Sequence, residues 1–134
     1  MNEHFQILVV DDDAEDQLIL DTFFQEAGMH GLVAYRENGQ EALYYLERIN
    51  HDSLLPRLIV LDLNMPILNG TQTLFQLKQA MRFRNIPVII FSTSQNETEK
   101  RKCLSLGAVD YMVKPLTQEE CRHIIKHFAS FVSK

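Results

Sequence analysis

The chain has 134 residues, of which 46% are hydrophobic and 23% charged, and its formal net charge is −5 at pH 7. This size and composition are ordinary for one globular domain, so we expect a single domain over residues 1–134 without an effector domain. The acidic balance argues against direct binding of nucleic acid or of an anionic membrane surface. No stretch approaches the ~18 consecutive apolar residues of a membrane-spanning helix.

The start of the chain and its cysteines bear on the compartment. The first residues show neither the basic start nor the apolar run of a secretory signal peptide. Two cysteines, Cys103 and Cys121, are far apart in the sequence and form no Cys-x-x-Cys motif. Disulfides are rare in reducing compartments, so this usage is typical of a cytoplasmic protein with free thiols.

The first part of the chain predicts two strands with a helix between them. The apolar run over 7–10 predicts a buried strand. Apolar residues then recur at helical spacing until Gly28, and Asp13 stands where a helix N-cap is expected. Residues 32–35 predict a second strand, which is less uniformly apolar and therefore suits the edge of a sheet.

A second helix and a strongly apolar strand follow. Asn38 with Glu41 resembles a capping box, which predicts the start of a helix. Residues 58–61 are all large and apolar, which is typical of a strand buried on both faces. This strand runs into Asp62, and Pro66 soon afterwards cannot donate a ladder hydrogen bond. The pattern therefore places one carboxylate at the tip of a buried strand.

Two further strand–helix units complete the chain. Asn69-Gly70 is a turn signal that precedes a third helix, and residues 88–91 predict another buried strand. Ser94 with Glu97 resembles the capping box of a polar fourth helix.

The fourth helix has few apolar residues, and we expect those to face inward. They are Cys103, Leu104 and Leu106. A fifth strand is predicted over 109–113, and Thr117 with Glu120 caps the last helix.

Strict alternation of strands and helices predicts a parallel sheet with helices on both faces. The most apolar strands, the first, third and fourth, belong in the centre, which gives the strand order 2-1-3-4-5. The fold class is therefore a flavodoxin-like (βα)5, doubly wound α/β sheet. In such a sheet ligands bind beyond the carboxyl ends of the strands, where the winding reverses between strands 1 and 3.

Polar groups from several segments converge on that edge: Asp11, Asp12, Asp62, Ser92 and Lys114. Carboxylates placed together repel one another unless a cation intervenes. Hard oxygen ligands suit Mg²⁺, with Mn²⁺ as an alternative, and a lysine offsets part of the remaining charge. A carboxylate nucleophile beside a cation, an ammonium and a hydroxyl is equipped to receive a phosphoryl group.

Several segments of the chain together resemble those of a known protein family. The chain resembles the receiver domain of bacterial two-component response regulators, the family of the chemotaxis regulator, from Ile7 to the last helix. The segments that carry the resemblance are VVDD at 9–12, LDLNMP at 61–66, PVIIFS at 87–92 and GAVDYMVKP at 107–115. The family has the same 2-1-3-4-5 strand order, so the resemblance and the pattern are not independent.

The resemblance implies roles for residues at the site. Asp62 matches the phosphoacceptor. Asp12 matches a direct Mg²⁺ ligand and Asp11 a ligand that acts partly through water. The backbone carbonyl of Asn64 matches the third protein ligand. Ser92 matches a switch hydroxyl that turns toward the phosphoryl oxygens, although threonine is commoner there.

Two further roles follow from the same resemblance. Lys114 matches the lysine that contacts the phosphoryl group, with a cis peptide to Pro115. Tyr111 matches an aromatic residue that moves inward when the switch hydroxyl engages, although it also suits an ordinary edge strand. Thr93 is bulkier than the alanine often found there, which would restrict access to Asp62.

The implied partners are a histidine kinase or histidine phosphotransfer domain as phosphate donor, and an unidentified downstream protein. The surface formed by the fourth helix, fifth strand and last helix would bind that downstream protein. Such a switch is not an enzyme for other substrates, because it catalyses only its own phosphorylation and slow dephosphorylation.

Three other functions compete with that of a signalling receiver. An Mg²⁺-dependent aspartyl-phosphate phosphatase resembling haloacid dehalogenases would carry a second Asp where Asn64 stands. A flavodoxin-like cofactor binder would not place acids at the end of the first strand, since they repel a phosphate. A relay shuttle without its own output would carry the same site residues as a signalling receiver.

Overall fold

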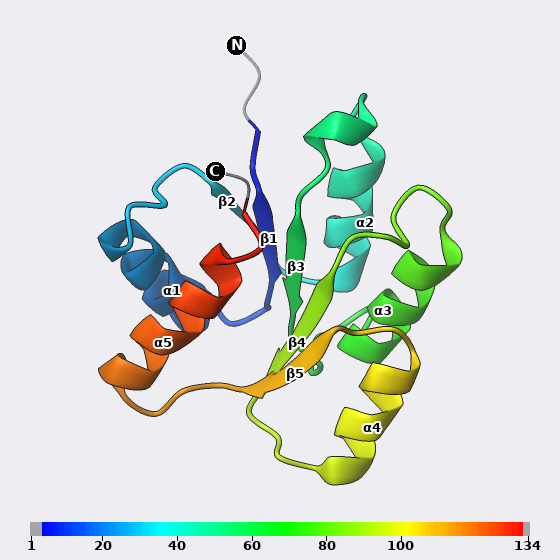
Figure 1. Cartoon of the computed structure of the whole chain (residues 1–134). Coiled ribbons are helices and arrows are strands. Elements are labelled where there is room, and N and C mark those ends of the chain that lie inside the picture. Colours follow the sequence, from blue (N-terminus) through cyan, green and yellow to red (C-terminus); the bar gives the residue numbers. More distant parts are fainter. Residues whose placement is uncertain (1–3, 133–134) are drawn as a thin grey trace.

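The computed structural model describes residues 4–132, in which five strands and five α-helices alternate (Figure 1). The elements are β1 (Ile7–Val10), α1 (Ala14–Glu26), β2 (Val33–Arg36), α2 (Gly39–Glu47), a short 3₁₀ helix η1 (Asp52–Leu54), β3 (Leu58–Leu61), α3 (Gly70–Gln79), β4 (Val88–Ser92), α4 (Glu97–Ser105), β5 (Asp110–Val113) and α5 (Gln118–Ala129). The predicted strands agree with these bounds to within one residue.

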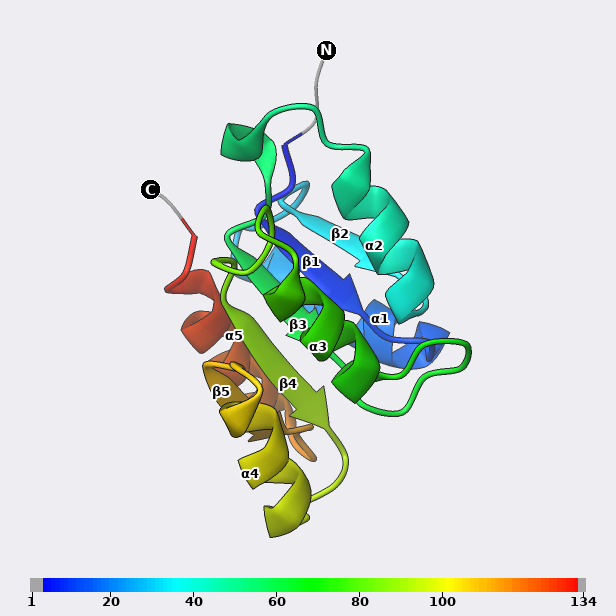
Figure 2. The ribbon, with the colours of Figure 1, turned by 90° about the vertical axis from the view of Figure 1, so that its right-hand side faces the viewer.

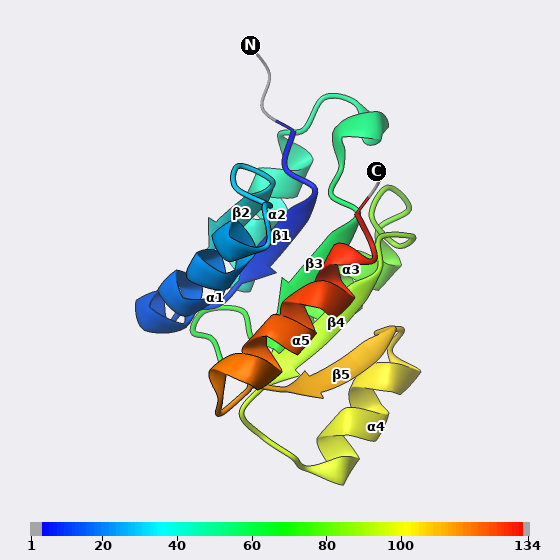
Figure 3. The same cartoon turned by 60° about the vertical axis from the view of Figure 1, so that its left-hand side comes forward.

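The strands form one parallel sheet in the order β2-β1-β3-β4-β5, which confirms the predicted flavodoxin-like fold. Helices α2, α3 and α4 cover one face of the sheet (Figure 2). Helices α1 and α5 cover the other face and lie side by side (Figure 3). The winding reverses between β1 and β3, which are direct neighbours at the centre of the sheet.

The central strands are buried on both faces, as their continuous apolar runs predict. In β1, Leu8 and Val10 pack on the side of α2, α3 and α4, whereas Ile7 and Val9 pack on the side of α1 and α5. Residues of β3 divide between the same two cores. Because successive side chains of a strand point to opposite faces, each strand joins both cores and is held in a fixed position.

Several predicted helix starts are confirmed. The Asp13 side chain accepts hydrogen bonds from the first amides of α1, and those of Asn38 and Thr117 cap α2 and α5. The predicted capping box of Ser94 with Glu97 is wrong. Asn96 caps α4 by accepting from the amide of Glu99, while Ser94 accepts from the amide of Asn96 and so forms a turn before the helix.

Other expectations also need correction. Asn69 caps α3, with a reciprocal capping box to Gln72, so Asn69-Gly70 begins a helix and is not only a turn. Leu104 is 39% exposed and does not face the core. No peptide bond is cis among the described residues, so the one between Lys114 and Pro115 is trans, the usual state of such bonds. Within residues 4–132, every helix is too short or too polar to span a bilayer.

Candidate functional site

The ends of β1 and β3 place two carboxylates side by side. Val10 and Leu61 are partners in the parallel ladder, and Asp11 and Asp62 follow them directly. The amide of Asp62 donates to the carbonyl of Val10 at 3.0 Å, and the amide of Asp11 donates to the carbonyl of Arg36 at 3.0 Å. The ladder therefore continues through both residues and fixes their backbones at the edge of the sheet.

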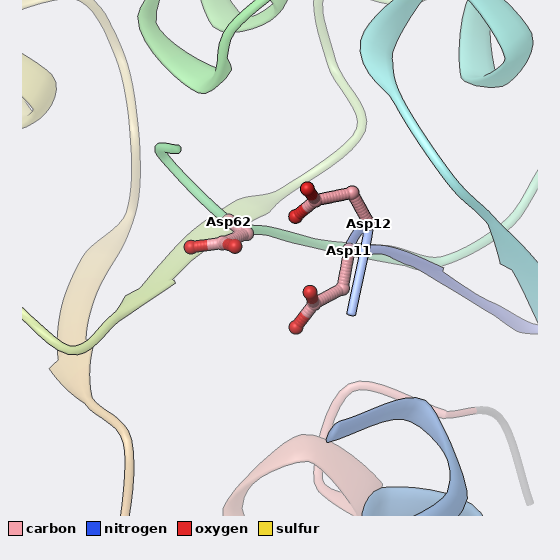
Figure 4. Close-up of side chains that lie close together, drawn as sticks. All are labelled: Asp11, Asp12 and Asp62. Atoms are coloured by element: carbon pink, nitrogen blue, oxygen red, sulfur yellow. The ribbon is translucent and has the colours of Figure 1, made fainter. Parts of the chain in front are cut away.

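Asp12 completes an acidic triad with Asp11 and Asp62. Figure 4 shows the three side chains near one another beyond the strand ends, and one carboxylate oxygen from each lies within 4.8 Å of the others. Asp11 is 1% exposed and Asp62 7%, whereas Asp12 is exposed to solvent. Three hard oxygen donors at this spacing, one of them open to water, fit Mg²⁺ or Mn²⁺, which prefer carboxylates and retain water ligands.

The carboxylate of Asp11 is held from both sides. Its Oδ1 accepts from the amide of Asp13 at 2.9 Å, and its Oδ2 accepts from the ammonium of Lys114 at 2.9 Å. Burial raises the pKa of Asp11, and the bonds from Lys114 and from the amide of Asp13 oppose that rise. The orientation of this side chain is therefore set by β1, by the start of α1 and by Lys114.

Lys114 follows β5, and its backbone amide donates to the carbonyl of Ser92 at 2.8 Å. Its Nζ lies 2.7 Å from Asp16 Oδ2, 2.9 Å from Asp11 Oδ2 and 3.5 Å from Asp62 Oδ2. Burial by itself lowers the pKa of the ammonium, but its hydrogen bonds with Asp16 and Asp11 outweigh burial and raise the pKa above the ordinary value. Lys114 is therefore a permanent positive charge within the acidic site.

Burial raises the pKa of Asp62 to about 6. This value is the net result, in which the negative charge of Asp11 adds to the rise, while Lys114 and the backbone amides of Leu63 and Asn64 oppose it. The Leu63 amide donates to Asp62 Oδ1 at 2.8 Å, and Oδ2 faces the ammonium of Lys114. The ionised form of Asp62 is thus only partly compensated by the protein, which favours the arrival of a cation.

Ser92 and Tyr111 meet at one short segment of the β4–α4 loop. Ser92, fully buried at the end of β4, accepts a hydrogen bond from the amide of Ser94 at 3.1 Å. The hydroxyl of Tyr111 donates to the carbonyl of Ser94 at 2.9 Å, and its ring is buried at 7% exposure. A displacement of Ser92 would therefore reach Tyr111 through the backbone of Ser94.

Two residues at the site were not predicted from the sequence to lie there. Asp16 on α1 makes the shortest ion pair of Lys114, a contact between distant segments that no local pattern indicates. Gly70 lies against the Asp62 backbone, and a Cβ there would be 2.2 Å from the carbonyl oxygen of Asp62. The sequence indicates a turn at Gly70, but it does not indicate this close contact with the backbone of Asp62. The role of the Asn64 carbonyl as a metal ligand stays a prediction.

The fold and the site define a doubly wound α/β protein with a metal-binding acidic pocket and a part-buried lysine ammonium at its switch point. The family model of the response regulator receiver domain matches residues 7–126, and the chain belongs to this family. It is therefore a signalling module of the type that two-component systems use, and it contains the acidic pocket of Asp11, Asp12 and Asp62.

Individual relatives agree with this assignment. The chain is 30% identical over 129 residues to the probable methanogenesis regulatory protein FilR2 of Methanothrix harundinacea. The aligned region covers 95% of this chain and 83% of that protein. It is 36% identical over 115 residues to a protein-glutamate methylesterase/protein-glutamine glutaminase of Bacillus subtilis, across 82% of this chain. Only 29% of that second relative is covered, so the chain spans less than a third of its length.

Solved structures of response regulators superpose closely on this fold. The phosphorylated cyanobacterial phytochrome response regulator RcpA is 28% identical with a TM-score of 0.82, and the match covers 96% of this chain and 93% of that one. The Mn²⁺-bound form of response regulator Rcp1 is 25% identical with a TM-score of 0.79, over 93% of this chain and 91% of that one.

Proposed function

We propose that this chain is a phosphorylatable receiver in a two-component phosphorelay, with Asp62 as the residue that accepts the phosphoryl group. The observation that carries the proposal is the position of Asp62 at the end of the central strand. Its carboxylate belongs to the acidic triad, and its Oδ2 lies 3.5 Å from the ammonium of Lys114. A carboxylate held between a cation site and a lysine can attack phosphorus while its surroundings stabilise the added charge.

The donor would be a phosphohistidine of a histidine kinase or phosphotransfer domain. A carboxylate oxygen of Asp62 attacks phosphorus, the P–O bond forms, the P–N bond breaks, and the imidazole leaves with the electron pair. Asp11, Asp12, Asp62 and the Asn64 carbonyl would hold Mg²⁺, which supplies charge neutralisation for the phosphoryl oxygens. The ammonium of Lys114 supplies a second positive charge beside Asp62.

The switch that follows phosphorylation would run through Ser92 and Tyr111. The Ser92 hydroxyl would donate to a phosphoryl oxygen, and the shared contact of both side chains with Ser94 couples that motion to β5. A population change from 1:99 to 99:1 requires about 5.5 kcal/mol. Hydrogen bonds to charged groups contribute about 1.5–3 kcal/mol each, so two or three new bonds, including those from Ser92 and Lys114, would reach this magnitude.

The output would be read at the surface formed by α4, β5 and α5, to which Tyr111 belongs. We propose an unidentified downstream protein as its partner and a cytoplasmic location, without direct binding of nucleic acid. The protein would act on no substrate besides its own phosphoryl group. The alternatives are a relay shuttle that passes its phosphate to a phosphotransfer domain, and an Mg²⁺-dependent aspartyl-phosphate phosphatase that turns over rapidly.

Phosphorylation can be tested without the natural kinase. The protein is incubated with Mg²⁺ and radiolabelled acetyl phosphate, and the acyl phosphate is quantified beside the Asp62→Asn variant. We expect labelling of the wild type that depends on Mg²⁺ and is lost in the variant. Asp13→Asn is the matched control, because it removes an adjacent acid outside the triad while asparagine keeps the helix cap.

Two outcomes would contradict the proposal. Labelling that survives Asp62→Asn would place the phosphoryl group elsewhere. Rapid release of inorganic phosphate over many turnovers from small phosphate esters would favour the phosphatase.

A further inference from the structure

The ammonium of Lys114 lies among three carboxylates, and the proposed phosphoacceptor is the most distant of them. Nζ is 2.7 Å from Asp16 and 2.9 Å from Asp11, but 3.5 Å from Asp62. Asp16 comes from the first turn of α1 and lies outside the acidic triad. Lys114 therefore forms its closest ion pair with a residue that neither ligates the proposed metal nor receives the phosphoryl group.

The two close partners of Lys114 differ in how readily they can release it. The side chain of Asp11 is 2% exposed, so separating it from Lys114 would leave an uncompensated buried charge. The side chain of Asp16 is 34% exposed, so water can solvate its carboxylate once the ion pair opens. Asp16 is therefore the partner from which the ammonium separates at the lower cost.

We propose that Asp16 is a positioning residue that competes with the phosphoryl group on Asp62 for the ammonium of Lys114. The inference rests on the proposed function, because it assumes that Lys114 binds the phosphorylated Asp62. In the unmodified protein Asp16 draws Lys114 toward α1. On phosphorylation the ammonium moves to the phosphoryl oxygens, and Asp16 turns to solvent while Asp11 keeps its contact. Asp16 thus lowers the stability of the phosphorylated state and limits its population.

The charges at the site also predict that Asp16 disfavours the phosphorylated state. Asp16 is the third carboxylate around one ammonium, next to a position whose charge changes from about −1 to about −2 on phosphorylation. Replacing it with asparagine removes one repulsive charge and one competitor for Lys114, and both changes favour an anion on Asp62. The same replacement removes a negative charge from the neighbourhood of the metal site, which disfavours a cation there.

These opposite signs define the test. Mg²⁺ alone and then beryllofluoride at saturating Mg²⁺, as the phosphoryl mimic, are titrated by calorimetry into the wild type, Asp16→Asn and Glu15→Gln. For Asp16→Asn we expect about fivefold tighter binding of beryllofluoride, the factor that corresponds to about 1 kcal/mol for a part-exposed ion pair. We expect equal or weaker binding of Mg²⁺. A variant with a damaged fold would bind both ligands less well.

Glu15→Gln is the matched control, since it removes one exposed acid from the same turn of α1 and leaves the Asp16–Lys114 pair in place. We expect it to bind beryllofluoride as the wild type does. The inference is overturned if Asp16→Asn binds beryllofluoride no more tightly than the wild type, or if Glu15→Gln tightens binding equally. If the wild type binds no beryllofluoride, or if Asp62→Asn binds it as tightly as the wild type does, the proposed function itself fails.

Discussion

Gly70 begins α3 directly against the backbone of Asp62. A Cβ at position 70 would lie 2.2 Å from the carbonyl oxygen of Asp62 and 2.6 Å from Cα of Leu63. The amide of Gly70 also donates to the carbonyl of Leu63 at 2.9 Å. The contact of α3 with this backbone therefore depends on the absence of a side chain at position 70, and any larger residue would push on the proposed phosphoacceptor.

We expect Gly70→Ala to destabilise the protein and to disturb the site together. Overpacking against a fixed backbone costs about 1–3 kcal/mol, because the chain has to shift to make room. Urea unfolding should show that loss, and calorimetry should show weaker binding of beryllofluoride. Gly28→Ala is the control. Gly28 has a φ of +78° with open space around it, so we expect a loss of about 1–2 kcal/mol while binding is retained. Unchanged binding in Gly70→Ala would contradict the prediction.

The fold was predictable because its signals are local and repeated. The uniform apolar runs of β1, β3 and β4 indicate strands buried on both faces, and alternation with helices leaves few topologies. The meeting of Asp11, Asp12 and Asp62 follows from that topology, since parallel strands end at one edge. These predictions needed no knowledge of side-chain geometry.

Contacts between side chains from distant segments were not predictable in the same way. The pairing of Asp16 with Lys114 joins residues 98 positions apart, and nothing in the sequence around either one indicates the other. The sequence predicts Ser94 as the cap of α4, whereas the structure has Asn96. Both residues offer a side-chain oxygen and both precede an acidic residue by three positions, so the pattern fits either one. Backbone geometry decides between such candidates, and the sequence pattern does not.

Ile67 is the only residue other than glycine with a positive φ in the described part of the chain, at 69°. A left-handed conformation costs an L-residue roughly 1–2 kcal/mol, and a β-branched side chain is especially unsuited to it. Asparagine tolerates this conformation better, and Ile67 is 79% exposed, so no core packing is lost. We therefore expect Ile67→Asn to raise the free energy of unfolding by about 1 kcal/mol in urea titrations.

Leu116→Asn, in the loop between β5 and α5, is the matched control, because it also exchanges an exposed apolar residue for asparagine. Leu116 is 94% exposed and its φ is not positive. Surface substitutions of this kind change stability by no more than about 0.5 kcal/mol. An equal gain in both variants would show that lower surface apolarity, and not relief of strain at Ile67, is the cause.

Asp62→Asn should stabilise the metal-free protein while abolishing phosphorylation. The pKa of Asp62 is raised from 3.8 to about 6, so protonation favours the folded state. Its contribution to stability is therefore present at low pH and is lost as pH rises from about 4 to about 6. At about pH 7.5 in EDTA we expect the variant to unfold with about 1–3 kcal/mol more free energy than the wild type.

The advantage of Asp62→Asn should shrink below about pH 4, where the wild-type carboxyl is protonated in both states. Urea unfolding at both pH values measures the difference. Asp12→Asn serves for comparison, because Asp12 is exposed and water compensates much of its charge. A wild type as stable as Asp62→Asn at the higher pH would contradict the prediction.

Tyr35 links β2 to α1, and its hydroxyl donates to Asp21 Oδ1 at 2.9 Å. Burial raises the pKa of the phenol, and the hydrogen bond to Asp21 and its negative charge raise it further. Because the folded-state pKa exceeds the unfolded one, the stabilisation is complete below about pH 10 and is lost as pH rises above it. We expect Tyr35→Phe to be about 0.5–1.5 kcal/mol less stable at about pH 8, with a gap that narrows above about pH 10.

Urea unfolding across this pH range measures the gap. Tyr44→Phe is the matched control, since it removes a phenol that is 54% exposed on the surface of α2. Cys103 and Cys121, whose pKa values are also raised by burial, are present in every variant and so cancel from the difference. Stability curves for Tyr35→Phe and the wild type that run parallel through about pH 10 would show that the phenol of Tyr35 ionises equally in both states.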